Sequence, residues 1–84
     1  DVLDRAMIDL LSFYRDVLAA QMGSDVEPVN IDLVEALDRV AVATGPEQSL
    51  ARIAAIEECR ARLRSNAAPL LAVESLMVQL RPQA

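Results

Sequence analysis

The chain contains no histidine, no tryptophan and no lysine, and Cys59 is the single cysteine among its 84 residues. One cysteine cannot form an intrachain disulfide, and a lone thiol fits a reducing compartment, so we expect a cytoplasmic protein. Zinc sites need three or four His or Cys ligands, and the nearest carboxylates, Asp25 and Glu27, lack the loop spacing that calcium demands. We therefore expect no metal and no cofactor. Cys59 is predicted to be a small core residue, because free cysteine is among the most buried residue types.

The same missing residue types argue against catalysis. The serines have no histidine to act as a base and no glycine-rich turn around them, and no lysine or glycine-rich loop is available to bind phosphate. Glu57 and Glu58 are adjacent carboxylates, but they point about 100° apart on a helix and cannot form an acid/base pair. We expect a protein without enzymatic activity.

The charge balance and the apolar runs exclude two further classes. The chain has eight arginines and thirteen acidic residues, for a net charge of −5. This negative charge disfavours a domain that binds nucleic acid through phosphate contacts. The longest apolar runs are far shorter than the roughly 20 residues needed to span a bilayer.

No signal peptide is expected, because the chain opens with Asp1 and Asp4 rather than with cationic residues. A start at Asp1 instead of Met suggests a domain of a longer polypeptide.

Hydrophobic residues make up 54% of the chain and aromatic residues only 2%, so the core must consist of aliphatic side chains. This length suffices for a single domain, which we assign to residues 1–84. Every glycine and proline falls in one of four places, and four helical segments with short linkers lie between them. No stretch alternates as a strand would. The sequence therefore predicts an all-α bundle of about four to five helices.

Local signals set the expected helix ends. The first helix should run from Val2 to Met22 and close at Gly23 with a positive φ. The second should begin at Asn30 as N-cap and end near Thr44 and Gly45. The third should begin at Pro46 and run to about Arg64. The fourth should be capped by Asn66, carry Pro69 in its first turn and stop before Pro82.

Apolar periodicity assigns the faces of these helices. The second helix is expected to turn Leu33, Leu37, Val40 and Ala41 inward, with Glu35 and Arg39 as an outward ion pair, and the third to turn Leu50, Ile53, Ile56 and Leu63 inward. The first and fourth helices are apolar on more sides than a four-helix monomer covers, which marks an interaction surface. We expect an isolated bundle of this size to be marginally stable and prone to self-association.

Three charged residues have two interpretations. Glu57 and Arg60 lie beside the apolar stripe of the third helix, and Glu74 interrupts the fourth. Either Glu57 and Arg60 pair within their helix while Glu74 is exposed, or these charges lie at a protein–protein interface. In the second case Glu74→Ala weakens subunit association and leaves the melting temperature within a few degrees. The candidate interface residues are Phe13, Arg15, Glu57, Arg60, Glu74 and Met77.

Two stretches of the chain carry a family resemblance. Phe13-Tyr14-Arg15-Asp16, followed by Val17 and Leu18, resembles the aromatic-aromatic-Arg-Asp-apolar-Leu signature in the C-terminal domain of bacterial DNA polymerase III delta prime subunits. The set Asn66, Pro69, Leu71, Ala72 and Glu74 is similar to the closing pattern of that domain. The two stretches stand in the expected order and spacing, so the resemblance covers nearly the whole chain.

This resemblance implies the helical collar domain of a clamp-loader subunit. Its partners would be the collars of the gamma/tau and delta subunits in a five-membered ring, while the ATPase-like fold would lie in preceding domains. The intact loader would open the sliding clamp and place it on DNA. Phe13 stands where Trp is frequent in the family, and residues 23–30 form a long acidic loop. These departures leave the related gamma/tau collar as an alternative. A generic helical adaptor, which would also be acidic, all-α and without chemistry, is a second alternative.

Overall fold

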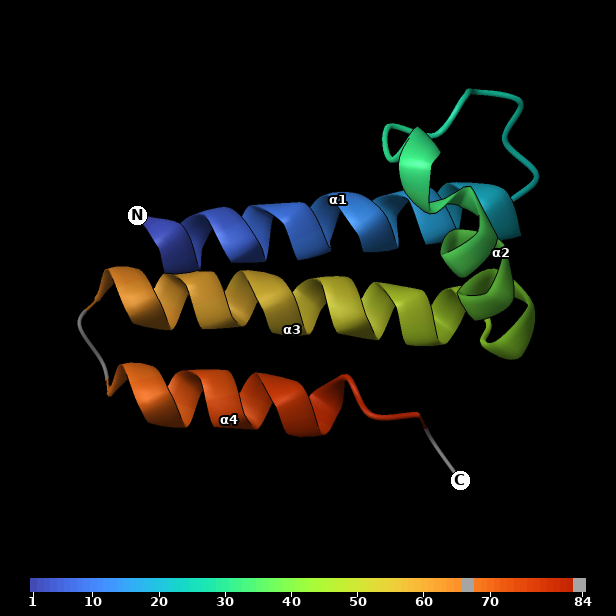
Figure 1. Ribbon diagram of the computed structural model, residues 1–84. Coiled ribbons are helices and arrows are strands. Elements are labelled where there is room, and N and C mark those ends of the chain that lie inside the picture. The colour runs from blue at the N-terminus through green and yellow to red at the C-terminus, as the bar shows by residue number, and fades with distance from the viewer. Residues whose placement is uncertain (66–67, 83–84) are drawn as a thin grey trace.

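The computed structural model describes residues 1–65 and 68–82, and these residues form helices without any strand. In chain order the elements are α1 (Val2–Gln21), the 3-10 helix η1 (Ile31–Leu33), α2 (Val34–Ala43), α3 (Pro46–Arg64) and α4 (Pro69–Gln79) (Figure 1). The predicted all-α class is confirmed.

Four helix ends have a local chemical cause. The carboxylate of Asp1 caps α1 by accepting a hydrogen bond from the backbone N–H of Asp4 at 2.9 Å. Past the other end of α1, Gly23 has a φ of 75°, a conformation that side chains with a Cβ disfavour. Pro46 and Pro69 are the first residues of α3 and α4, where a missing N–H costs no helical hydrogen bond. Both prolines are placed as predicted.

Asn30 precedes the first helical turn of the second segment as predicted, but the prediction that its side chain caps the helix is wrong. Asn30 makes no capping hydrogen bond with its side chain, and the α-helix begins only at Val34, after the 3-10 turn. The physical reason is that Asp16 and Ser12 of α1 bind the Asn30 amide and turn it away from the helix end. The predicted cap Asn66 lies outside the described residues.

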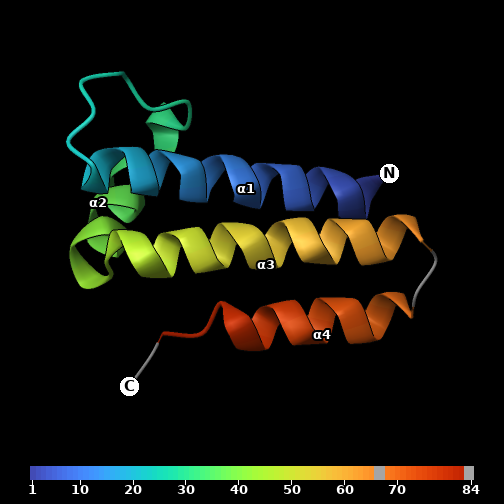
Figure 2. The ribbon, with the colours of Figure 1, turned by 180° about the vertical axis from the view of Figure 1, so that it is seen from behind.

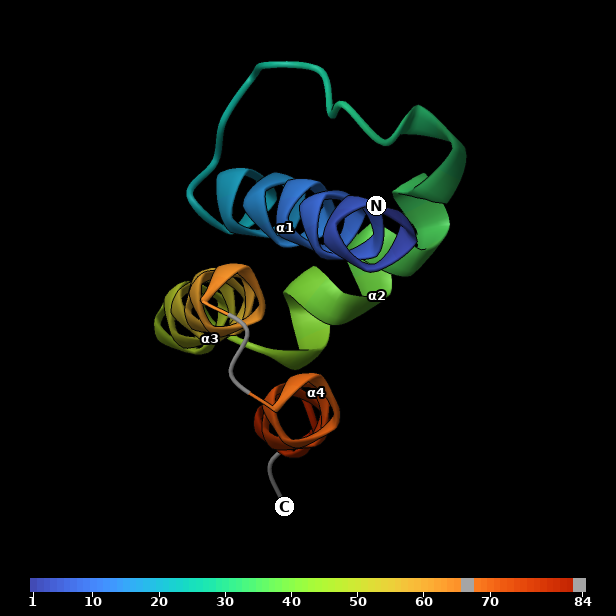
Figure 3. The ribbon, with the colours of Figure 1, turned by 90° about the vertical axis from the view of Figure 1, so that its left-hand side faces the viewer.

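Helix α3 is the central element of the bundle. Helices α1 and α4 lie along it on different sides and both run antiparallel to it, while the short α2 crosses near the end of α1 and the start of α3 (Figures 1 and 2). Viewed along the helix axes, α1 and α4 are separated, and the backbone of α4 comes close to α3 alone among the described helices (Figure 3). One side of α4 is therefore left without a helical neighbour.

The main core cluster lies between α1, α3 and α4 and comprises Met7, Leu11, Ala55, Ile56, Cys59, Ala72 and Leu76. Cys59 is buried as predicted, with 2% of its surface exposed. Leu37 of α2 is buried, but Leu33 is exposed because it lies in the 3-10 turn and not on the face of α2. Leu50 was expected inside and is 55% exposed, because the neighbouring Ser49, with 0% exposure, takes the inward position on α3.

Candidate functional site

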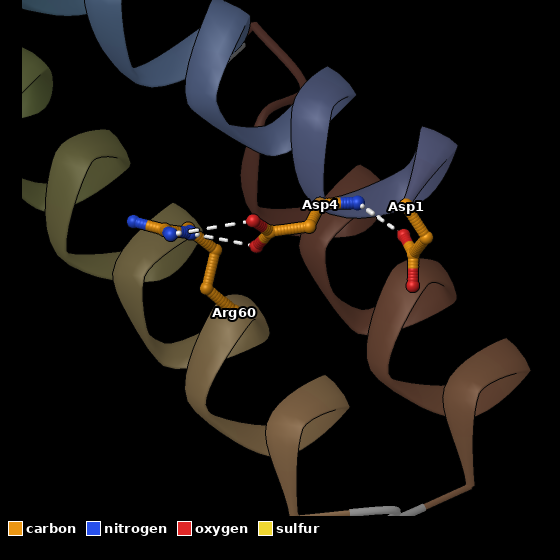
Figure 4. Close-up of polar contacts among 3 residues, drawn as sticks. All are labelled: Asp1, Asp4 and Arg60. Atoms are coloured by element: carbon orange, nitrogen blue, oxygen red, sulfur yellow. Dashed lines mark hydrogen bonds and ion pairs between the residues drawn. The ribbon is translucent and has the colours of Figure 1, made fainter.

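Two ion pairs join α1 to α3, and they involve Glu57 and Arg60. The Arg60 guanidinium donates from Nε to Asp4 Oδ1 at 3.0 Å and from Nη2 to Asp4 Oδ2 at 3.5 Å (Figure 4). Glu57 instead pairs with Arg15, at 3.6 Å between Oε1 and Nη2. The predicted intrahelical pair of Glu57 with Arg60 is therefore wrong, because the neighbouring helix offers each charge a partner of opposite sign.

Arg15, Glu57 and Arg60 lie at a shallow open groove of about 600 Å³ between α1 and α3. Its lining residues are Leu11, Arg15, Ala54, Glu57, Glu58, Arg60, Ala61 and Arg64. Arg15 and Glu57 are more than half exposed, so their pair contributes little to stability. The hydrogen bond from Arg60 holds the pKa of Asp4 below its ordinary value. The groove thus presents compensated charges, which suit contacts at a polar rim better than chemistry on a substrate.

Asp16 is the most densely hydrogen-bonded carboxylate of the described chain, and sequence reasoning missed its role. It is 8% exposed, and it accepts from the backbone N–H of Val29 at 3.1 Å and from the backbone N–H and side-chain amide of Asn30 at 2.8 and 2.7 Å. Burial by itself would raise the pKa of Asp16, but these hydrogen bonds outweigh burial and leave the pKa below its ordinary value. Asp16 therefore holds the end of the 23–30 loop against α1.

Gln21 joins the ends of three helices. Its Nε2 donates to the carbonyl oxygens of Ala41 and Thr44 and to the Thr44 hydroxyl, at 3.1 to 3.2 Å. Its Oε1 accepts from the Ser49 hydroxyl at 2.7 Å. A single amide thereby satisfies the C-terminal end of α2 and a fully buried serine of α3, which makes this a structural site.

The aromatic pair of α1 contacts α3 through Tyr14. The rings of Phe13 and Tyr14 meet edge to face with centroids 5.3 Å apart, and the Arg52 guanidinium lies 5.5 Å from the centre of the Tyr14 ring. Arg52 is only 7% exposed, and Phe13 is half-buried. The apolar stripe of α3 gave no sign of a buried arginine at this position, because a charged residue is ordinarily assigned to solvent.

Among the described helices, α4 has the most large apolar side chains that are exposed. Four large side chains on it are strongly exposed: Leu70 by 72%, Leu71 by 66%, Met77 by 57% and Val78 by 56%. Glu74 lies among them and is also exposed. We call these five residues the α4 outer face. Of the predicted interface residues, Glu74 and Met77 share this face, whereas Phe13, Arg15, Glu57 and Arg60 lie on α1 and α3, so the structure does not join the six in one site.

A second apolar surface surrounds η1. Val29, Ile31, Leu33 and Val34 are all exposed, and we call them the η1 patch. Figures 1 and 3 place η1 beyond α1 and α4 beyond α3, on opposite sides of the bundle. The sequence predicts an extra apolar side on the first and last helices but not at η1, where Leu33 is expected to face inward on the second helix.

Comparison with known proteins gives no further guide to the site. No family model matches the chain, and no curated protein and no solved structure matches it significantly. Within residues 1–65 and 68–82, no group of three or more His, Cys, Asp or Glu side chains could hold a metal ion. Within the same residues, no helix has both the length and the apolar character needed to cross a membrane. The candidate functional site of the chain is therefore its two exposed apolar surfaces, the α4 outer face and the η1 patch.

Proposed function

We propose that the chain is the collar domain of a clamp-loader subunit of the bacterial DNA polymerase III delta prime type. In this proposal it is a non-catalytic, cytoplasmic oligomerisation domain that holds the five-membered loader together for placing the sliding clamp on DNA. Its partners are the collars of the gamma/tau and delta subunits. The observation that carries the proposal is the position of the α4 outer face and the η1 patch on opposite sides of one small bundle.

Two different surfaces on opposite sides suit a member of a ring. A ring with neighbours on both sides of each subunit uses heterologous contacts, in which one surface of a subunit meets a different surface of the next. A simple adaptor needs only one such surface. Exposed apolar groups of this number on a domain of 84 residues favour burial against other chains.

The contacts of the Phe13-Tyr14-Arg15-Asp16 stretch support the family resemblance. Asp16 fixes Val29 and Asn30, so it also fixes the direction of the η1 patch that follows. Arg15 contacts Glu57 and Tyr14 contacts Arg52, so the same stretch sets how α1 lies on α3. A motif whose residues position a surface is consistent with a domain that works by assembly.

The proposal is tested by co-expressing the chain with gamma/tau and delta subunits and measuring the mass of the purified complex by size-exclusion chromatography with light scattering. The chain should elute with the other subunits. Leu71→Asp on the α4 outer face and Ile31→Asp in the η1 patch should each weaken assembly at least about tenfold, because each buries a carboxylate at an apolar contact.

Val42→Asp is the matched control. Val42 is 88% exposed on α2 and belongs to neither surface, so the same substitution there should leave assembly unchanged. A chain that folds but never elutes with the loader subunits would reject the proposal and favour an adaptor for another partner. Assembly that requires gamma/tau to be omitted would instead assign the chain to the gamma/tau position.

A further inference from the structure

The α4 outer face has an unusual symmetry around its one charge. Leu70 and Val78 each lie four positions from Glu74, and Leu71 and Met77 each lie three positions away. At about 100° per residue, the five residues cover about 120° of the helix circumference, with Glu74 in the middle. The buried residues Ala72 and Leu76 lie on the other side, toward α3. The carboxylate therefore stands at the centre of the apolar face and not at its edge.

This symmetry acts against pairing with a second copy of the chain. A two-fold dimer that buries all four apolar side chains places α4 against α4, and its two helices run either parallel or antiparallel. In both arrangements the centre of one face meets the centre of the other, so Glu74 faces Glu74 of the second copy. Two like charges facing each other in a desolvated contact are strongly unfavourable, and no cation of the described residues lies within 4.0 Å of Glu74 to compensate.

We propose that the α4 outer face binds a helix of a different chain, one with an apolar stripe that carries an arginine or lysine at its centre. Such a partner covers the four apolar residues and supplies a cation for Glu74, while the same carboxylate disfavours pairing of α4 with α4 of a second copy. The apolar contacts provide the burial, and the central charge selects the partner. This inference rests on the proposed function for the identity of the partner, and it makes Glu74 the residue that favours a mixed assembly over a homodimer.

The inference can be tested with this chain alone, because Glu74→Arg creates a partner of the required chemistry. Sedimentation equilibrium should find the wild-type chain and the Glu74→Arg variant each monomeric, and their equimolar mixture associated. We expect the mixed association constant to exceed that of either chain alone by at least about tenfold. Glu74→Lys offers a second variant with the same charge if the arginine variant fails to fold, as judged by circular dichroism.

Two controls tie the effect to this face. Glu27→Arg makes the same charge change in the exposed 23–30 loop, so its mixture with the wild-type chain should stay monomeric. Adding Leu71→Asp to the Glu74→Arg chain should abolish the mixed association. The inference is overturned if the wild-type chain dimerises as tightly as the mixture, if the Glu27→Arg mixture associates equally well, or if association survives Leu71→Asp.

These outcomes are separable from those of the clamp-loader proposal. A mixture that associates, from a chain that never joins the loader subunits, keeps the inference and removes the proposed partner. A chain that joins the loader although the mixture stays monomeric keeps the proposed function and removes the role assigned to Glu74.

Discussion

The carboxylate of Asp16 and the amide of Asn30 meet at 2.7 Å although they lie 14 positions apart in the chain. With the backbone N–H groups of Asn30 and Val29, three donors converge on one buried acid. Asp16→Ala should remove these three hydrogen bonds to a charged carboxylate, so we expect the free energy of unfolding to fall by about 2 kcal/mol. Urea denaturation followed by circular dichroism measures this change.

Asp25→Ala is the control for this prediction. Asp25 lies in the 23–30 loop that Asp16 holds against α1, but its side chain is exposed. Its removal should therefore change the free energy of unfolding by less than about 0.5 kcal/mol. Equal losses for the two variants would mean that loop charge, and not the Asp16 hydrogen bonds, stabilises this end of the bundle.

The stability of the chain should depend on pH through the same residue. The pKa of Asp16 lies below its ordinary value, because the hydrogen bonds from Asn30 and Val29 outweigh the effect of burial. A carboxyl with a lowered folded-state pKa contributes stability that is fully present above the unfolded pKa of about 3.9. That stability is lost as the pH falls through the folded-state pKa. Asp4 should also lose a stabilising contact as the pH falls, because the hydrogen bond from Arg60 lowers the pKa of Asp4.

We therefore expect the melting temperature of the wild-type chain to fall more steeply between about pH 5 and pH 2 than that of Asp16→Asn. The variant is less stable at neutral pH but has one fewer group to protonate. Thermal melts at a series of pH values make the comparison, with Asp25→Asn as a variant that should follow the wild-type slope. Parallel curves for wild type and Asp16→Asn would contradict the assignment.

The side chain of Gln21 should contribute far more to the free energy of unfolding than an ordinary surface amide does. Its side chain makes four hydrogen bonds that join α1 to the end of α2 and the start of α3, and one partner, the Ser49 hydroxyl, has no exposed surface. Gln21→Ala leaves that hydroxyl unsatisfied, and we expect a loss of about 2 to 3 kcal/mol in the free energy of unfolding. Gln79→Ala serves as the control, since Gln79 makes one exposed bond to Ser75 and should lose less than about 0.5 kcal/mol.

The end of α1 and the start of α3 were predictable because their causes are local. Gly23 ends α1 and Pro46 begins α3 through the backbone conformations that these residues favour or fix. The inward position of Ser49 was not predictable, because its partner Gln21 lies 28 residues away and apolar periodicity assigns such a polar residue to solvent. The contact of Asn30 with Asp16 was not predictable for the same reason, because the two residues lie 14 positions apart.

The candidate site was predictable in part. An exposed Glu74 and Met77 follow from a helix that is apolar nearly all round, because one side of such a helix must face away from its own bundle. The partners of Arg60 and Glu57 do not follow, since they depend on where Asp4 and Arg15 of α1 come to lie. The exposed η1 patch depends on the Asp16 tether and is equally non-local.

Cys59 should report the opening of the core. Its thiol is 2% exposed within the main cluster, and burial raises its pKa, although the nearby Arg62 acts in the opposite direction. Alkylation needs an accessible thiolate, so the folded chain should react with iodoacetamide far more slowly than the unfolded chain in urea. The rate in the absence of urea should follow the small fraction of opened molecules, as expected when reclosing is fast.

A core variant tests whether this rate reports opening. Ile56→Ala removes a side chain with no exposed surface beside Cys59, so it should lower the free energy of unfolding by about 2 to 5 kcal/mol and speed alkylation in proportion. Leu50→Ala, on the exposed side of the same helix, should change both quantities little. Mass spectrometry of timed samples gives the alkylation rate for each chain. If Ile56→Ala lowers the free energy of unfolding but leaves the rate unchanged, Cys59 reacts through a local path, and the cluster around it does not open as one unit.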